Sequence, residues 1–331
     1  MERFALAAAV VLGFALTAAL CSLFVPLRRV LERREQQQQP VQSEQPRPAP
    51  LRAPLWGGLC AAAGTVAAVG VGWLAACVGQ PELLGSEGRL MTRLLTALAG
   101  SLAFGAVGLA EDLARMRSPA ALGLRRDVRL LLEALAAAFV LLLLRAAGCL
   151  PRGLGVPGAG YVLLGSAVPL LWAVLMVALA ECARIAERDE GVVCGAAFVA
   201  MLALMMAEAG LGVPGLAVLP AALAGALVAL GLWAFPPAKL GVGCCGSLLA
   251  AGAIGCIPLS LDMTSLTVPL ALPFWAAGGL LAAQLLCAKR TGKPLRCWVK
   301  KHKMSPEMVF LCSFALSAVG YVLALALLRW C

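Results

Sequence analysis

The chain has 331 residues, of which 62% are apolar and only 13% are charged, and its mean hydropathy is +0.91. A soluble domain averages about half apolar and about a quarter charged residues, so this composition excludes a single water-soluble domain and predicts a chain that crosses a lipid bilayer. The net charge of +10 does not indicate a nucleic-acid partner, because the basic residues gather on one side of the predicted topology.

Ten apolar runs, each long enough for a helix to cross the hydrocarbon core, follow one another along the chain. They lie at about 3–26, 56–78, 92–110, 129–148, 161–182, 192–210, 216–235, 243–261, 266–288 and 308–329. The first run precedes its arginines instead of following a basic segment, so it predicts a retained helix and not a signal peptide. We expect an all-α fold: a polytopic membrane bundle of about ten transmembrane helices, forming one domain over residues 1–331.

The basic residues predict how these helices are oriented. Lysine and arginine gather in cytoplasmic loops of membrane proteins. If the N-terminus lies outside, the odd-numbered connections are cytoplasmic, and they hold all but six of the 27 lysines and arginines. The six on or near the outer face are Arg3, Arg89, Arg93, Arg145, Arg152 and Arg329. The sequence therefore predicts both termini outside.

Three of the predicted connections have a distinctive composition. The cytoplasmic loop 27–55 contains a glutamine- and proline-rich stretch, 35–50, that cannot bury apolar surface and is predicted to be disordered. The cytoplasmic loop 289–307 is strongly basic. The outer connection 149–160 is rich in glycine and proline, which predicts a tight turn.

Acidic residues are scarce, and two groups of them lie at predicted cytoplasmic helix ends. The first is Glu111–Asp112, and the second consists of Glu181, Glu187, Asp189 and Glu190. Carboxylates that converge at a membrane surface suit Mg²⁺, and such an ion would offset phosphate charge during transfer. The alternative is ordinary ion pairing with nearby arginines. Those arginines are Arg115, Arg117, Arg184 and Arg188.

A third polar feature, Pro236 to Ser247, joins two apolar runs on the cytoplasmic side. Lys239 is followed there by a glycine-rich turn and the start of the next run. A lysine beside a helix start can hold a phosphate through its charge and through free backbone N–H groups. Alternatively, the glycines serve only close helix packing.

Taken in order, these segments resemble the polyprenyl-phosphate N-acetylhexosamine-1-phosphate transferases, and within that family most closely the phospho-N-acetylmuramoyl-pentapeptide transferases. Residues 53–58 are similar to the family motif TPTMGG, 108–112 to GFxDD, and 237–247 to PAKVFMGDTGS. Residues 184–191 stand where NLTDGLDG is expected. Residues 122–124, leading to Arg129, and the basic segment 289–293 resemble further parts of the family pattern, so the likeness spans about 53–307.

This resemblance implies a reaction, in which a sugar 1-phosphate passes from a UDP-sugar to undecaprenyl phosphate on the cytoplasmic side of the bacterial inner membrane. Mg²⁺ is the implied cofactor and UMP the leaving product; in the closest type the lipid product is lipid I of peptidoglycan synthesis. The implied partners are the two substrates and membrane lipid, with no nucleic acid, and the resemblance is compatible with a homodimer.

The resemblance also assigns candidate site residues. The catalytic candidates are Glu111, Asp112, Glu187 and Glu190. Asp112 and Glu187 are the candidate metal ligands. The substrate-binding candidates are Arg129, Lys239, Gly243, Gly246, Ser247 and His302. We expect Asp112, Glu187 and Cys244 to lie within about 10 Å of one another, the reach of a shared metal or pyrophosphate.

The chain departs from the family at several of these positions. Cys244 replaces the aspartate of MGD, which is a metal ligand in the family, and sulfur is a poor ligand for Mg²⁺. Glu187 and Glu190 replace aspartates, Arg184 replaces an asparagine, and only His302 remains of a histidine-rich motif. Three hypotheses follow: an active transferase with shifted ligands, a catalytically silent member that binds polyprenyl phosphate or cell-envelope partners, and an unrelated transporter. The transporter ranks last, because few polar residues lie at mid-membrane.

Overall fold

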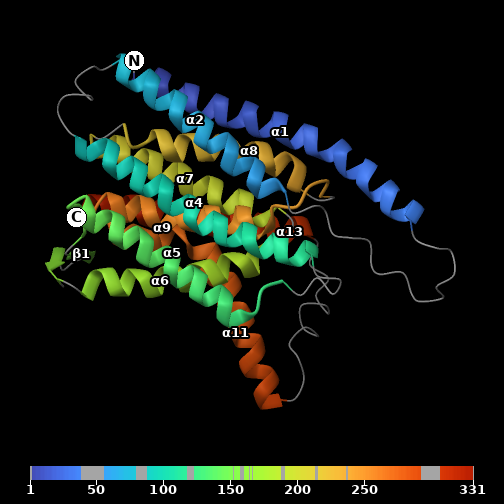
Figure 1. Ribbon diagram of the computed structural model, residues 1–331. Coiled ribbons are helices and arrows are strands. Elements are labelled where there is room, and N and C mark those ends of the chain that lie inside the picture. The colour runs from blue at the N-terminus through green and yellow to red at the C-terminus, as the bar shows by residue number, and fades with distance from the viewer. Residues whose placement is uncertain are drawn as a thin grey trace.

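The computed structural model describes residues 2–38, 56–79, 88–117, 123–151, 153–156, 160–163, 165, 167–187, 191–212, 215–235, 238–291 and 306–330. Figure 1 shows helices lying side by side in one bundle, with α1 along one edge and α6 along the opposite edge. The first helix begins and the last helix ends at the same end of this bundle (Figure 1). The start of α1 and the end of the last helix therefore lie on one side of the bundle, and the expectation that both termini are outside remains a prediction.

The bundle is built from apolar segments rich in alanine and leucine, which form helices because a backbone in lipid must satisfy its hydrogen bonds within the segment. The first helices are α1 (Glu2–Gln38), α2 (Gly57–Gly79), α4 (Gly88–Arg117), α5 (Arg126–Ala146) and α6 (Ala167–Ala186). The later ones are α7 (Val192–Gly210), α8 (Val218–Ala234), α9 (Gly243–Ser260), α10 (Thr267–Leu270), α11 (Leu272–Thr291) and α13 (Pro306–Trp330), with a 3₁₀ turn at Thr264–Leu266.

Within the described residues, seven helices are long and apolar enough to cross a membrane: α1, α2, α4, α6, α7, α9 and α13. The segment Thr264–Leu270 and the helix that follows it pass the same test together, with a bend of 63° between them, which raises the number to eight. The apolar helix α8 has only 17 residues, and α5 carries several charges. The chain is thus a multi-pass membrane protein. Each of the ten predicted runs contains a helix, and ten crossings remain a prediction.

The first helix is longer than the sequence predicted. It continues to Gln38, so the first part of the loop expected at 27–55 is helical. Residues 27–38 are mostly leucine, arginine, glutamate and glutamine, which favour helix. Residues 39–55 lie outside the described part of the chain. The basic loop expected at 289–307 is helical as far as Thr291, and its residues 292–305 are likewise not described.

A short hairpin corrects one predicted boundary. The strands β1 (Gly153–Val156) and β2 (Gly160–Leu163) pair antiparallel, with Val156 opposite Gly160. The fifth apolar run was expected to begin a helix at 161, but α6 begins at Ala167. The end of an apolar run does not distinguish strand from helix, and the β-prone residues Tyr161 and Val162 extend the run into the strand.

Helix α9 is the core of the bundle. Every residue from Gly243 to Ser260 is buried, and the helix contacts α4 most extensively, with α2, α6 and α7 on its other sides. Its many glycine, alanine and cysteine residues allow these neighbours to approach closely. The first turn of α9 therefore lies where several helices meet.

Candidate functional site

The first turn of α9 needs partners for its backbone N–H groups. Gly243 has a φ of +73°, a left-handed conformation that favours glycine, and the chain turns there into the helix. The preceding residue, Val242, gives no side-chain cap. The first N–H groups of a helix have no partner within it, so their acceptors must come from elsewhere.

Asp112, near the end of α4, supplies these acceptors. Its Oδ1 accepts the N–H of Cys244 at 3.0 Å, and its Oδ2 accepts the N–H of Cys245 at 2.9 Å. The carboxylate is buried, with Asp112 only 1% exposed. A negative charge at a helix N-terminus is favoured by the free donors and by the helix dipole. Asp112 therefore caps α9 from a neighbouring helix.

Glycines bring three helix ends together around this cap. The N–H of Gly57 donates to the Gly241 carbonyl at 3.2 Å, and the N–H of Gly58 donates to the Val242 carbonyl at 2.8 Å. A Cβ on Gly58 would overlap the backbone of Gly246. The glycine-packing alternative for Gly246 is thus supported by the contact between α2 and α9.

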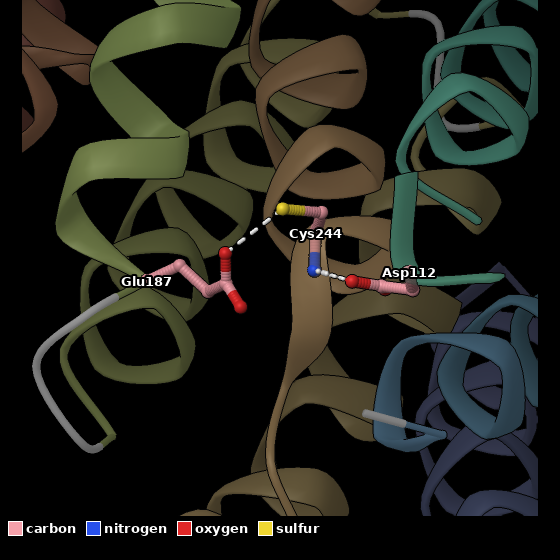
Figure 2. Close-up of side chains that lie close together, drawn as sticks. All are labelled: Asp112, Glu187 and Cys244. Carbon is pink, nitrogen blue, oxygen red and sulfur yellow. Dashed lines mark hydrogen bonds between the residues drawn. The ribbon is translucent and has the colours of Figure 1, made fainter. Parts of the chain in front are cut away.

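Asp112, Glu187 and Cys244 form a compact group, which we call the acid–thiol cluster. Figure 2 shows Cys244 between the other two residues, with its sulfur toward Glu187 and its nitrogen toward Asp112. The thiol donates to Glu187 Oε2 at 3.0 Å. One ligand atom from each residue lies within 4.8 Å of the others. The expected convergence of these three residues is confirmed, and their roles remain predictions.

The guanidinium of Arg115 lies beside the acid–thiol cluster. Its Nη2 donates to Glu111 Oε1 at 2.7 Å, while its Nη1 lies 3.6 Å from Glu187 Oε1 and 3.9 Å from Asp112 Oδ1. Arg115 therefore balances part of the negative charge from three carboxylates. The sequence offered two alternatives for these acids, convergence at one site and ion pairing with arginine. Both occur here.

A second ion-pair group connects α4, α5 and α6. Glu181 accepts from Arg129 Nε at 2.7 Å and from Arg184 Nη2 at 2.7 Å, and Arg129 Nη1 lies 3.6 Å from Glu111 Oε1. Arg129 is only 7% exposed. The guanidinium predicted to bind substrate is thus engaged in ion pairs between helices, and its contact with substrate remains a prediction.

Two of the other predicted site residues, Lys239 and Ser247, make contacts that the structure describes. Lys239 is exposed, and its Nζ lies 5.9 Å from the centre of the Trp233 ring, a cation–π contact. Ser247 is buried, and its hydroxyl donates to the Cys244 carbonyl at 3.1 Å. Glu190 and His302 lie outside the described residues.

Sequence reasoning missed two features of this site. The spacing of Glu111 and Arg115 by four residues indicates a helical ion pair, but nothing in the sequence links Arg115 to Glu187. Pairing of Glu181 with Arg184 was among the alternatives that the sequence offered, but its second partner, Arg129, lies on another helix and was not foreseen. Contacts between residues of separate helices leave no short-range pattern in the amino-acid sequence.

A model of the family described as "Glycosyl transferase family 4" matches residues 94–262, more than half of the chain. The matched stretch contains all three residues of the acid–thiol cluster. The chain belongs to this family. The glycosyl transferase family 4 proteins are polyprenyl-phosphate sugar-1-phosphate transferases, so the match argues against an unrelated transporter. A search of curated proteins finds no match.

Members of glycosyl transferase family 4 generally depend on Mg²⁺, but the acid–thiol cluster does not fit that ion. Mg²⁺ demands oxygen ligands in near-octahedral geometry, and Cys244 offers sulfur. With that sulfur in place of an oxygen ligand, the cluster offers Mg²⁺ only two carboxylates. We therefore derive no chemical step through Mg²⁺.

Proposed function

We propose that this family 4 protein binds undecaprenyl phosphate and a UDP-sugar beside the acid–thiol cluster, and transfers the sugar 1-phosphate to the lipid in a step of the lipid I type. The observation that carries the proposal is the meeting of three family segments at one point: the end of α4, the turn after α6 and the start of α9. The predicted topology puts this point at the cytoplasmic surface of the bacterial inner membrane, where both substrates have access.

The reaction is an exchange of phosphate bonds. An oxygen of the lipid phosphate bonds to the β-phosphorus of the UDP-sugar, the bond from that phosphorus to the oxygen shared with the α-phosphate breaks, and UMP leaves. Catalysis of such transfers depends mainly on positioning and on offsetting phosphate charge. Among the described residues, exposed Lys239 and the partly exposed Arg115 are two cations that could attract the phosphates. Glu187, also partly exposed, would orient the reacting groups.

A second candidate function, binding of the lipid phosphate without transfer, is favoured by Cys244. A neutral thiol in place of a carboxylate removes one negative ligand and so lowers the repulsion that a bound phosphate would meet, which favours phosphate binding over turnover. On either hypothesis we expect little UMP release when Mg²⁺ is the sole divalent cation. A homodimer remains a prediction.

One experiment distinguishes the two candidate functions. The purified full-length protein is incubated with undecaprenyl phosphate, a panel of UDP-sugars and several divalent cations, and the UMP released is measured. The transferase predicts UMP release that requires the lipid phosphate and yields a lipid-linked sugar. Saturable binding of undecaprenyl phosphate with no UMP under any condition would support the silent candidate. Absence of both binding and release would contradict both.

A further inference from the structure

We propose that the acid–thiol cluster is a site for a divalent cation softer than Mg²⁺, of the Zn²⁺ class. The proposal starts from the poor fit of Mg²⁺ to this site. The family generally uses Mg²⁺, whereas this chain presents one sulfur and two carboxylates at the cluster. Zn²⁺ takes cysteine sulfur together with carboxylate oxygen in four-coordinate sites, and a site with three protein ligands leaves a fourth position for water or substrate. Cys244, Asp112 and Glu187 supply three such ligands.

The spacing of the ligand atoms suits one small cation. Ligands of one tetrahedral zinc lie about 3.5 Å apart, given metal–ligand bonds of about 2.0–2.3 Å. The Cys244 Sγ and Glu187 Oε2 are 3.0 Å apart, and the three ligand atoms all lie within 4.8 Å. A side-chain movement of about 1 Å would therefore bring the three atoms to the ligand spacing of one tetrahedral cation and leave the fourth position open.

A neighbouring carboxylate independently indicates an additional positive group. Glu111 is only 2% exposed, and its Oε2 has no hydrogen-bond partner among the described residues. Its other oxygen contacts the same Arg115 guanidinium that approaches Asp112 and Glu187. Buried carboxylate oxygens without a partner are rare and costly, and a cation in the acid–thiol cluster would compensate this one.

The arginine does not fill the position proposed for the cation. Its contacts with Asp112 and Glu187, at 3.9 and 3.6 Å, are longer than hydrogen bonds. Once Cys244 binds a metal as thiolate and releases its proton to solvent, four negative groups (Cys244 and the carboxylates of Glu111, Asp112 and Glu187) face Arg115 and, at Glu111, also Arg129. That excess of negative charge favours a dication, and the metal–sulfur bond selects a soft one.

This inference deepens the proposed function, because it concerns the same site, but cation binding does not require turnover. The probe is Co²⁺, which gives an intense near-ultraviolet charge-transfer band when a thiolate binds it. We expect this band on titrating the full-length protein with Co²⁺. Zn²⁺ should abolish the band by competition, whereas Mg²⁺ in about 100-fold excess should not, because it has little affinity for sulfur.

Three variants make the experiment specific in a chain with 13 cysteines. Cys244→Ser should lose the band, whereas Cys245→Ser, one residue along the same turn, should keep it. Glu187→Gln retains the thiol and should weaken Co²⁺ binding by about 100-fold, the upper end of the effect of losing an outer-shell partner. Gel filtration and thermal unfolding of each variant establish that it is folded.

The proposal is overturned if the wild type and Cys244→Ser give the same band, or if Mg²⁺ competes with Co²⁺ in the wild type. Cys244→Asp offers a further check, because an added carboxylate should let Mg²⁺ compete with Zn²⁺. A Cys244-dependent band without UMP release would support the cation site and contradict the transferase. UMP release without the band would support the transferase and contradict the cation site.

Discussion

At the scale of single residues, Asp112 combines a structural role, capping α9, with the catalytic or metal-binding role that the family resemblance implies. The family resemblance marks it as a catalytic acid and metal ligand, whereas the structure shows both of its oxygens bound to N–H groups of α9. A residue that holds the site together is expected to affect stability as well as activity when it is replaced. Glu187 differs, because its partly exposed side chain contacts the Cys244 thiol and Arg115 and caps no helix among the described residues.

This difference predicts stability effects of unequal size for two conservative variants. Asp112→Asn keeps one acceptor oxygen but places an NH₂ group opposite an N–H donor, so the free energy of unfolding should fall by about 1–2 kcal/mol. Glu187→Gln should change it by less than about 0.5 kcal/mol. Thermal unfolding in detergent measures both, with exposed Asp127→Asn as the matched control. Equal melting temperatures for all three variants would contradict the capping role of Asp112.

The Glu181 bridge gives a second prediction at this scale. Glu181→Ala leaves two guanidinium groups, Arg129 and Arg184, without their shared carboxylate. Removing one partner of a buried pair costs about 3–5 kcal/mol. Because the Glu181 side chain is 23% exposed, we expect a smaller loss, about 1–3 kcal/mol. A loss no larger than that of Asp127→Asn would show that the bridge does not stabilise the bundle.

At the scale of elements, glycines set the distance between the helices that form the site. A Cβ on Gly108 in α4 would overlap the carbonyl group of Cys244, so α4 and α9 can approach only because this side chain is absent. That approach is what brings Asp112, one turn further along α4, to the first turn of α9. The motif resemblance marks Gly108, and the physical reason appears only when the two helices are seen together.

We therefore predict that Gly108→Ala is destabilising although alanine favours helix. The added methyl should cost about 1–3 kcal/mol through overpacking and should also weaken cation or substrate binding by moving Asp112. Gly70→Ala in α2 is the matched control, because nothing lies within 4 Å of the added Cβ. It should leave stability unchanged or raise it. Similar melting temperatures for the two variants would show that the α4–α9 contact adapts without cost.

Sequence patterns predicted the helices well and their arrangement poorly. Apolar runs predict membrane helices because lipid forces backbone hydrogen bonds to form locally, and each of the ten runs contains one. The convergence of Asp112, Glu187 and Cys244 was expected only through the family resemblance, since residues so far apart in the chain share no periodic signal. The Arg115–Glu187 contact depends on tertiary packing, and no local pattern encodes it. The hairpin at Gly153–Leu163 has local signals in its glycine- and proline-rich turn and its β-prone residues, but the apolar run concealed them.

At the scale of the whole molecule, topology gives the next prediction. The distribution of basic residues predicts that the segments 27–55, 111–128 and 289–307 face the cytoplasm. Reporter fusions at positions 120 and 300 should therefore read as cytoplasmic, and a fusion at position 157, beside the hairpin, as external. An external reading at position 300 would show that the last part of the predicted topology is inverted. The basic loop would then lie on the opposite side of the membrane from the acid–thiol cluster.

The most direct test of the central claim is the rate of sugar 1-phosphate transfer to undecaprenyl phosphate, measured as lipid-linked product, for the wild type, Glu187→Gln and Asp127→Asn side by side. Both variants remove one carboxylate on the predicted cytoplasmic side, and only Glu187 belongs to the acid–thiol cluster. Loss of a residue that orients or exchanges protons with reacting groups typically slows catalysis by about 10²–10⁴-fold. We predict that loss for Glu187→Gln and an unchanged rate for Asp127→Asn. Equal rates in the wild type and Glu187→Gln would contradict the assignment of this cluster as the active site.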